Sequence, residues 1–128
     1  LHSSGAMIGV ANALRLQGRA EEAEPMVRAA LEIRVAELPP EHWQIAQARA
    51  ILGLCLADMS QDTDAASLLE SSLGPLRERL GPDHWLPVEA GARLKEILNG
   101  NGQSARTDSL QRTMTVRTGR IGDYTEGD

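Results

Sequence analysis

Two histidines and one cysteine are the residues of this sequence that could carry out chemistry most directly. His42-Trp43 and His84-Trp85 lie forty-two positions apart, and Cys55 lies between them on an apolar stretch. Imidazole and thiolate can bind zinc, but no His or Cys pair has the short spacing of a zinc site. We expect the His-Trp pairs to wedge the turns between adjacent repeated units and Cys55 to be buried and unreactive. The sequence therefore predicts no catalytic residue, no metal and no cofactor.

The spacing of the two His-Trp pairs is the period of an internal repeat. The segment from Leu38 to Trp43 is nearly copied by the segment from Leu80 to Trp85. The same step superposes several apolar residues, namely Leu14 on Leu56, Ala23 on Ala65, Leu31 on Leu73, Ala48 on Ala90, Leu52 on Leu94 and Leu56 on Leu98. A fixed period of this length is typical of stacked helical hairpins.

The composition favours an all-α protein of ordinary domain size. The chain has 128 residues, an aromatic content of 2% and no Phe, so Leu, Ala, Ile, Val and Met must form the core. The net charge of -5 argues against nucleic acid or anionic lipid as the main ligand. No apolar run is long enough to span a membrane, and a single cysteine suits a reducing compartment, so we expect a cytoplasmic protein.

Five helices are expected from the apolar spacing. They run over residues 3–17, 21–38, 42–59, 62–80 and 84–98, and the first should bury Ala6, Met7, Val10, Ala11 and Leu14. We expect Gly18 to end the first helix and Pro25 to lie in the first turn of the second. Asp62 or Thr63 should cap the fourth helix and Asp83 the fifth.

Two positions should modify the regular helices. Gly53 should allow two helices to approach closely, and Gly74-Pro75 should kink the fourth helix or end it early. The repeats are expected to occupy residues 1–102, with units 1–41 and 42–83 and a capping helix at 84–99. Residues 103–128 should form a mostly disordered polar tail. Leu1 falls inside an apparent repeat, so we expect a piece of a longer protein.

The hairpins resemble tetratricopeptide repeats of the forty-two-residue, kinesin-light-chain-like type. The motif is carried by Val10, Ala11, Leu14, Gly18, Ala23, Val27 and Ala30, and then by Leu52, Gly53, Leu56, Ser60, Ala65, Leu69 and Ser72. The resemblance implies a right-handed superhelix of about two and a half repeats, which is a non-catalytic module for binding other proteins.

A narrower resemblance rests on His42-Trp43, Gln47-Ala48-Arg49 and Leu52-Gly53. It is to the C-terminal repeat region of bacterial serine/threonine protein kinases. No kinase motif is present in this chain, so this resemblance would make it a regulatory or docking region with the catalytic domain upstream.

In this family the first helix of each unit lines the concave face, where a peptide or another domain of the parent chain could bind. By the repeat register the expected residues are Ile8, Asn12, Arg15, Gln47, Ala50, Leu54, Asp58, Glu89, Glu96 and Asn99. The paired Asn common in peptide-binding relatives is replaced by Ile8-Gly9, Ala50-Ile51 and Ala92-Arg93. Self-association through the first helix, which has no helix before it, is a further possibility.

Overall fold

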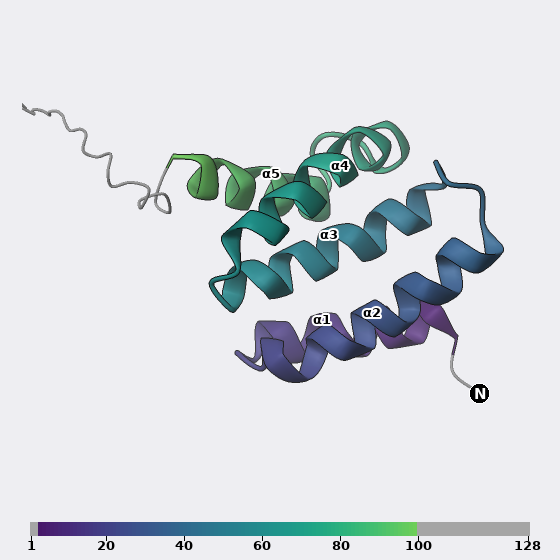
Figure 1. Ribbon diagram of the computed structural model, residues 1–128. Helices are drawn as coiled ribbons and strands as arrows, with labels where there is room; N and C mark the ends of the chain where they lie inside the picture. The colour runs from purple at the N-terminus through teal and green to yellow at the C-terminus, as the bar shows by residue number, and fades with distance from the viewer. Residues whose placement is uncertain (1–2, 100–128) are drawn as a thin grey trace, which may run out of the picture. The chain divides into compact units, whose positions relative to one another are not determined.

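A computed structural model of the chain describes residues 3–99, and every regular element in that range is an α-helix (Figure 1). The helices are α1 (Ser4–Leu16), α2 (Ala20–Glu37), α3 (Trp43–Asp58), α4 (Asp62–Leu80) and α5 (Trp85–Leu98). The expected all-α class and the five expected helices are confirmed. The end of the expected repeat domain, residues 100–102, and the expected tail, residues 103–128, lie outside the described residues.

The chain divides into two compact units, residues 1–91 and 92–128, and the division falls inside α5. In the first unit α1 packs against α2 and α3 packs against α4, which makes two helical hairpins (Figure 1). The hairpins join because α2 packs against α3, with a smaller contact between α1 and α3. The forty-two-residue period of the sequence therefore corresponds to one hairpin.

Both hairpins turn through the same backbone motif. Gly18 and Ser60 follow the ends of α1 and α3 and have positive φ angles of 81° and 62°. The next residue in each case donates its N–H to the carbonyl oxygen of Leu14 or Leu56, at 2.9 and 2.8 Å. This is the Schellman arrangement, and it satisfies carbonyls that the end of a helix leaves without partners. The expected role of Gly18 is confirmed.

The central helix, α3, is surrounded by other helices along most of its second half. Every residue from Ile51 to Ala57 is buried, so this part of the helix has no solvated face. At Gly53, a Cβ atom would come within 2.9 Å of Cγ of Leu69 on α4. The expected close approach of two helices at this glycine is therefore confirmed, because only a residue without a side chain fits there.

The buried side of α1 differs from the expected one. Ile8, Ala11 and Arg15 are buried, whereas Ala6 is exposed and Val10 is 51% exposed. The repeat pattern places Val10 at the position of Leu52, which is covered because α3 has helices on both of its sides. Among the described residues no helix covers the corresponding side of α1.

Prolines interrupt the helices less than expected. α2 begins at Ala20, so Pro25 lies inside the helix and not in its first turn. α4 continues through Pro75 to Leu80, so the early end expected at Gly74-Pro75 was wrong. Proline costs a backbone hydrogen bond, but Leu76, directly after Pro75, is fully buried. Packing of the apolar side of the helix outweighs that local cost.

The start of α4 also differs from the expectation. Gln61 precedes the helix and makes no side-chain capping bond, while Asp62 is already the first helical residue. Neither Asp62 nor Thr63 is therefore the capping residue. Asp62 and Asp64 in the first turn still place negative charge at the positive end of the helix dipole.

Candidate functional site

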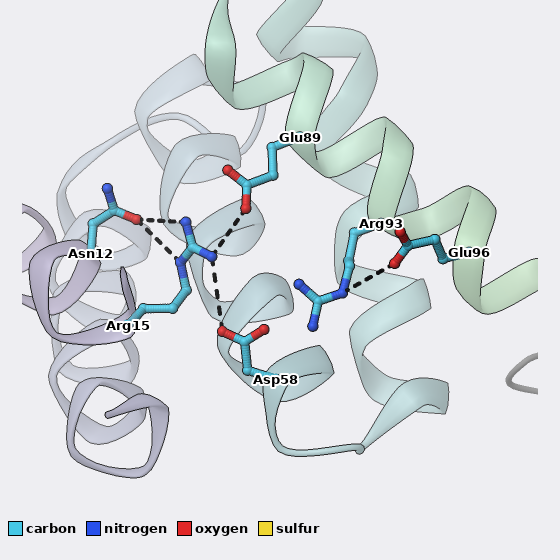
Figure 2. A network of polar contacts seen from close by, with 6 residues as sticks. All are labelled: Asn12, Arg15, Asp58, Glu89, Arg93 and Glu96. Carbon is cyan, nitrogen blue, oxygen red and sulfur yellow. Dashed lines mark hydrogen bonds and ion pairs between the residues drawn. The ribbon is translucent and has the colours of Figure 1, made fainter. Parts of the chain in front are cut away.

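A buried arginine on α1 brings polar side chains from three helices together (Figure 2). Nη1 of Arg15 donates to Oε2 of Glu89 on α5 at 3.1 Å and lies 3.9 Å from Oδ2 of Asp58 at the end of α3. Nε and Nη2 donate to Oδ1 of Asn12 at 3.2 and 3.0 Å. The Arg15 side chain is only 3% exposed. The first helices of successive hairpins therefore share one polar cluster.

The acids of this cluster face solvent although the arginine does not. The side chains of Asp58 and Glu89 are 26% and 37% exposed. A buried guanidinium needs anionic or hydrogen-bonding partners to offset its lost hydration. Arg15 has both, so the two carboxylates are held in place at the surface. Figure 2 also shows an ion pair within the second unit, between Arg93 and Glu96 at 3.7 Å.

A second buried arginine, Arg34 on α2, joins the starts of α1 and α3. Its Nε donates to Oγ of Ser4 at 2.9 Å, and its Nη1 donates to the Gln44 carbonyl at 2.7 Å and to Oε1 of Gln47 at 2.8 Å. Arg34 is 4% exposed, and burial lowers the pKa of its guanidinium. The charge is therefore stabilised by neutral oxygen atoms of α1 and α3.

The two repeated histidines, His42 and His84, are helix caps. Nδ1 of His42 accepts the N–H of Gln44 at 3.1 Å, and Nδ1 of His84 accepts the N–H of Leu86 at 3.2 Å. Each imidazole thereby satisfies one of the free N–H groups in the first turn of α3 or α5. The expectation that Asp83 caps α5 was wrong. The repeated His directly before an apolar helix was the sequence feature that could have revealed this role.

The two tryptophans differ in their surroundings. The indole of Trp43 is half-buried, and the guanidinium carbon of Arg79 on α4 lies 5.3 Å from the centre of its ring. This is a cation–π contact within one hairpin. Trp85 is 47% exposed. The exposure of Trp85 does not fit the expected wedge between adjacent units, which stays a prediction for Trp43.

The remaining reactive group is inaccessible. Cys55 is fully buried, as expected, and burial raises the pKa of its thiol to about 11. Within residues 3–99 no group of three or more His, Cys, Asp or Glu side chains could hold a metal ion. None of the helices in that range is long and apolar enough to cross a membrane.

The residues expected on the concave face fall into three groups. Buried members are Ile8, Arg15, Ala50 and Leu54, with exposures of 5%, 5%, 0% and 0%. Asn12, Gln47, Asp58 and Glu89 belong to the first unit and keep part of their side chains in solvent. Glu96 and Asn99 are exposed and belong to the second unit. Arg15 brings Asn12, Asp58 and Glu89 together, whereas Gln47 is bound to Arg34.

A family model described as tetratricopeptide repeat matches residues 3–74, which is more than half of the chain. The chain belongs to the tetratricopeptide repeat family. No curated protein and no solved structure gave a significant match. Tetratricopeptide repeats are generally scaffolds that bind other proteins and are not themselves catalytic.

The tetratricopeptide match agrees with the packing of the hairpins. Gly53 and Leu69, which the repeat motif places on facing helices, are in direct contact. The matched residues include all of α1 to α3 and most of α4. In a tetratricopeptide scaffold the exposed polar groups held by Arg15 are candidates for contacts with a partner.

Proposed function

We propose that this chain binds a peptide or another protein on the expected concave face, through a first-helix surface made of Asn12, Gln47, Asp58 and Glu89. The observation that carries the proposal is the cluster around Arg15. It fixes polar groups of α1, α3 and α5 side by side while leaving two carboxylates partly in solvent. Preorganised side chains lose little freedom on binding, which favours recognition of a partner.

The chemistry of the first-helix surface suits a polypeptide ligand. The amides of Asn12 and Gln47 can bond to a peptide backbone, and the carboxylates of Asp58 and Glu89 can accept from N–H groups or from basic side chains. The negative surface makes nucleic acid or anionic lipid a poor ligand. Ile8, Ala50 and Leu54 are buried and support the shape of this surface. Glu96 and Asn99 are exposed in the second unit and stay a separate part of the expected face.

Shift mapping by NMR tests this proposal. A peptide selected from a random displayed library is titrated into the labelled chain, and shifts are expected to concentrate at the first-helix surface. Glu89→Gln removes a charge there, whereas Glu37→Gln removes one from an exposed position on α2. Only Glu89→Gln should weaken binding of the peptide, with a dissociation constant about tenfold higher. Shifts confined to other surfaces, or equal effects of both variants, would contradict the proposal.

The finer family relationship remains part of the proposal. The forty-two-residue period supports the kinesin-light-chain-like type, although Ile8-Gly9 and Ala50-Ile51 replace the usual paired Asn. Asn12 and Gln47 would then take over the contacts to the peptide backbone. We also propose a cytoplasmic location, supported by the single buried Cys55, and cell fractionation tests it.

A second candidate function is that of a regulatory or docking region in a bacterial serine/threonine kinase. It is favoured by the resemblance of His42-Trp43, Gln47-Ala48-Arg49 and Leu52-Gly53 to the repeat region of such kinases. Reading the coding frame upstream of Leu1 tests it. A glycine-rich phosphate loop and a catalytic Asp are expected there, and a frame without them rejects this candidate.

A further inference from the structure

Two side-chain amides of the first-helix surface are bound by buried arginines. Nε and Nη2 of Arg15 donate to Oδ1 of Asn12 at 3.2 and 3.0 Å, and Nη1 of Arg34 donates to Oε1 of Gln47 at 2.8 Å. Arg15 and Arg34 are 5% and 4% exposed, whereas the two amide side chains are half-buried. In each pair the arginine therefore lies on the inner side and the amide on the outer side.

The chemistry of arginine determines which end of each amide faces inwards. A guanidinium has only N–H donors and no acceptor, so the oxygen of an amide must face it. An amide turned the other way would place its NH2 group against the N–H groups of the arginine and would take an acceptor from a buried cation. Figure 2 shows the amide nitrogen of Asn12 turned away from Arg15. The orientation of both amides is therefore fixed before any partner binds.

The groups that these two amides present outwards are donors. The oxygens of Asn12 and Gln47 already accept from arginine. Within residues 3–99 no hydrogen-bond acceptor faces either amide nitrogen, so both NH2 groups keep their capacity to donate. A partner at the first-helix surface therefore meets N–H donors from the amides and acceptor oxygens from the carboxylates.

We propose that Asn12 and Gln47 each donate to a main-chain carbonyl oxygen of the bound peptide. The inference rests on the proposed peptide site and names the group that each amide recognises. A neutral carbonyl is favoured over a carboxylate of the partner, because Asp58 and Glu89 lie around the same Arg15 as Asn12 and would repel a negative charge. Every residue of a peptide has a carbonyl, so these two contacts would hold the main chain whatever its sequence.

Exchange of the amide nitrogen for an oxygen tests this assignment. Asn12→Asp and Gln47→Glu keep the shape of the side chain and the oxygen that accepts from arginine, but they replace the outward NH2 donor by an acceptor. The new carboxylates can pair with Arg15 and Arg34, so both variants should remain as resistant to urea as the native chain. A loss of binding in these variants would therefore not result from unfolding.

The probe is a peptide selected from a displayed library encoded without Asp and Glu and synthesised with an amidated C-terminus, so that it has no carboxylate. Each variant should raise its dissociation constant at least about tenfold, because an oxygen would face the peptide carbonyl. Gln17→Glu is the matched control, since Gln17 also accepts from an arginine, Arg19 at 3.3 Å, but lies exposed at the end of α1. It adds the same charge and should change the affinity by less than about twofold.

NMR signals of the side-chain NH2 groups report the donors directly. On addition of the peptide, the NH2 protons of Asn12 and Gln47 should shift downfield as they enter hydrogen bonds, whereas those of Gln17 should stay in place. Binding at the first-helix surface with unchanged affinity in Asn12→Asp and Gln47→Glu would overturn this inference and leave the proposed peptide site intact. Binders from a random library but none from the carboxylate-free library would overturn it as well. Failure of both libraries would also overturn the proposed function.

Discussion

At the scale of single residues, Ser60 is a point of backbone strain. It has a φ of 62° in the turn after α3, whereas the equivalent turn after α1 uses Gly18. A left-handed conformation costs an ordinary L-residue roughly 1 kcal/mol more than it costs glycine. The second hairpin therefore keeps its Schellman turn although Ser60 is unfavourable in this conformation.

We expect Ser60→Gly to raise the free energy of unfolding by about 0.5–1 kcal/mol, since it removes this strain and leaves both backbone bonds of the turn in place. The reciprocal change, Gly18→Ser, should lower it by a similar amount. Urea denaturation followed by circular dichroism measures both. If Ser60→Gly were neutral or destabilising, the positive φ would not be a source of strain.

The thiol of Cys55 gives a second prediction at this scale. Burial raises its pKa to about 11 from an ordinary value of 9.0, so the native chain should not react with a thiol reagent at pH 8 and should react fully in urea. The unfolded thiol ionises first. The protonated Cys55 thiol therefore contributes fully to the stability of the folded chain below pH 9, and this contribution is lost as the pH rises towards 11. Cys55→Ala should lack this part of the alkaline destabilisation. Rapid labelling of Cys55 in the native chain would contradict the prediction and would show that α3 opens locally.

At the scale of the elements, His42 and His84 determine where α3 and α5 begin. Both imidazoles accept a backbone N–H through Nδ1, although His is an uncommon capping residue. The His42 ring also stacks against Trp43 with 6.3 Å between ring centres. The capping bond and the stacking can be separated by mutation.

His42→Ala should lower the free energy of unfolding by about 1 kcal/mol, because one N–H of the first turn loses its partner. His42→Asn restores a capping oxygen without the ring and should stay close to the native stability. Thermal unfolding of the two variants under the same conditions distinguishes them. Equal losses in both would assign the contribution to stacking on Trp43.

The five helices were predicted from the sequence because apolar spacing is local, whereas the caps of α4 and α5 and the effect of Pro75 were not. Gly18 ends α1 and the apolar stripe of α4 sets its length, and both are visible without neighbours. The buried side of α1 was not predictable in the same way. Val10 has the position of a core residue in the repeat, and only the missing neighbour makes it exposed.

The candidate site was predictable only in part, since burial of charge depends on partners distant in sequence. Asn12, Asp58 and Glu89 were placed on one face by the repeat register, but nothing in the pattern shows that Arg15 lies beneath them. Arg34 is buried in the same way. Its acceptors come from other helices, which a periodicity cannot reveal.

At the scale of the whole molecule, two arginines connect the hairpins. Arg34 does so at the starts of α1 and α3, and Arg15 does so at the end of α3. Arg34 on α2 reaches Ser4 of the first hairpin and Gln47 of the second. In a repeat array each unit is stabilised largely by its neighbour. Polar links of this kind therefore act on the coupling between units as well as on each unit.

Arg34→Met should lower the free energy of unfolding by about 1–3 kcal/mol, because it leaves the Gln47 side chain without its donor and releases the start of α1. Amide exchange should speed up most at the start of α1. Arg28→Met is the matched control, since Arg28 is 52% exposed and pairs with Glu24 of its own helix, and it should change stability by less than about 0.5 kcal/mol. A stabilised Arg34→Met would mean that dehydration of the buried charge outweighs its hydrogen bonds.

The close contact at Gly53 also constrains how the repeats can diverge. Gly53 faces Leu69, and the residues one period earlier are Ala11 and Val27, both fully buried. The two pairs contain the same number of side-chain carbons, with one methyl group transferred from one helix to the other. Exchange of a single helix between the hairpins would therefore join Ala to Leu, which collide, or Gly to Val, which leave a void. The two helices of a hairpin can therefore be duplicated or exchanged only together.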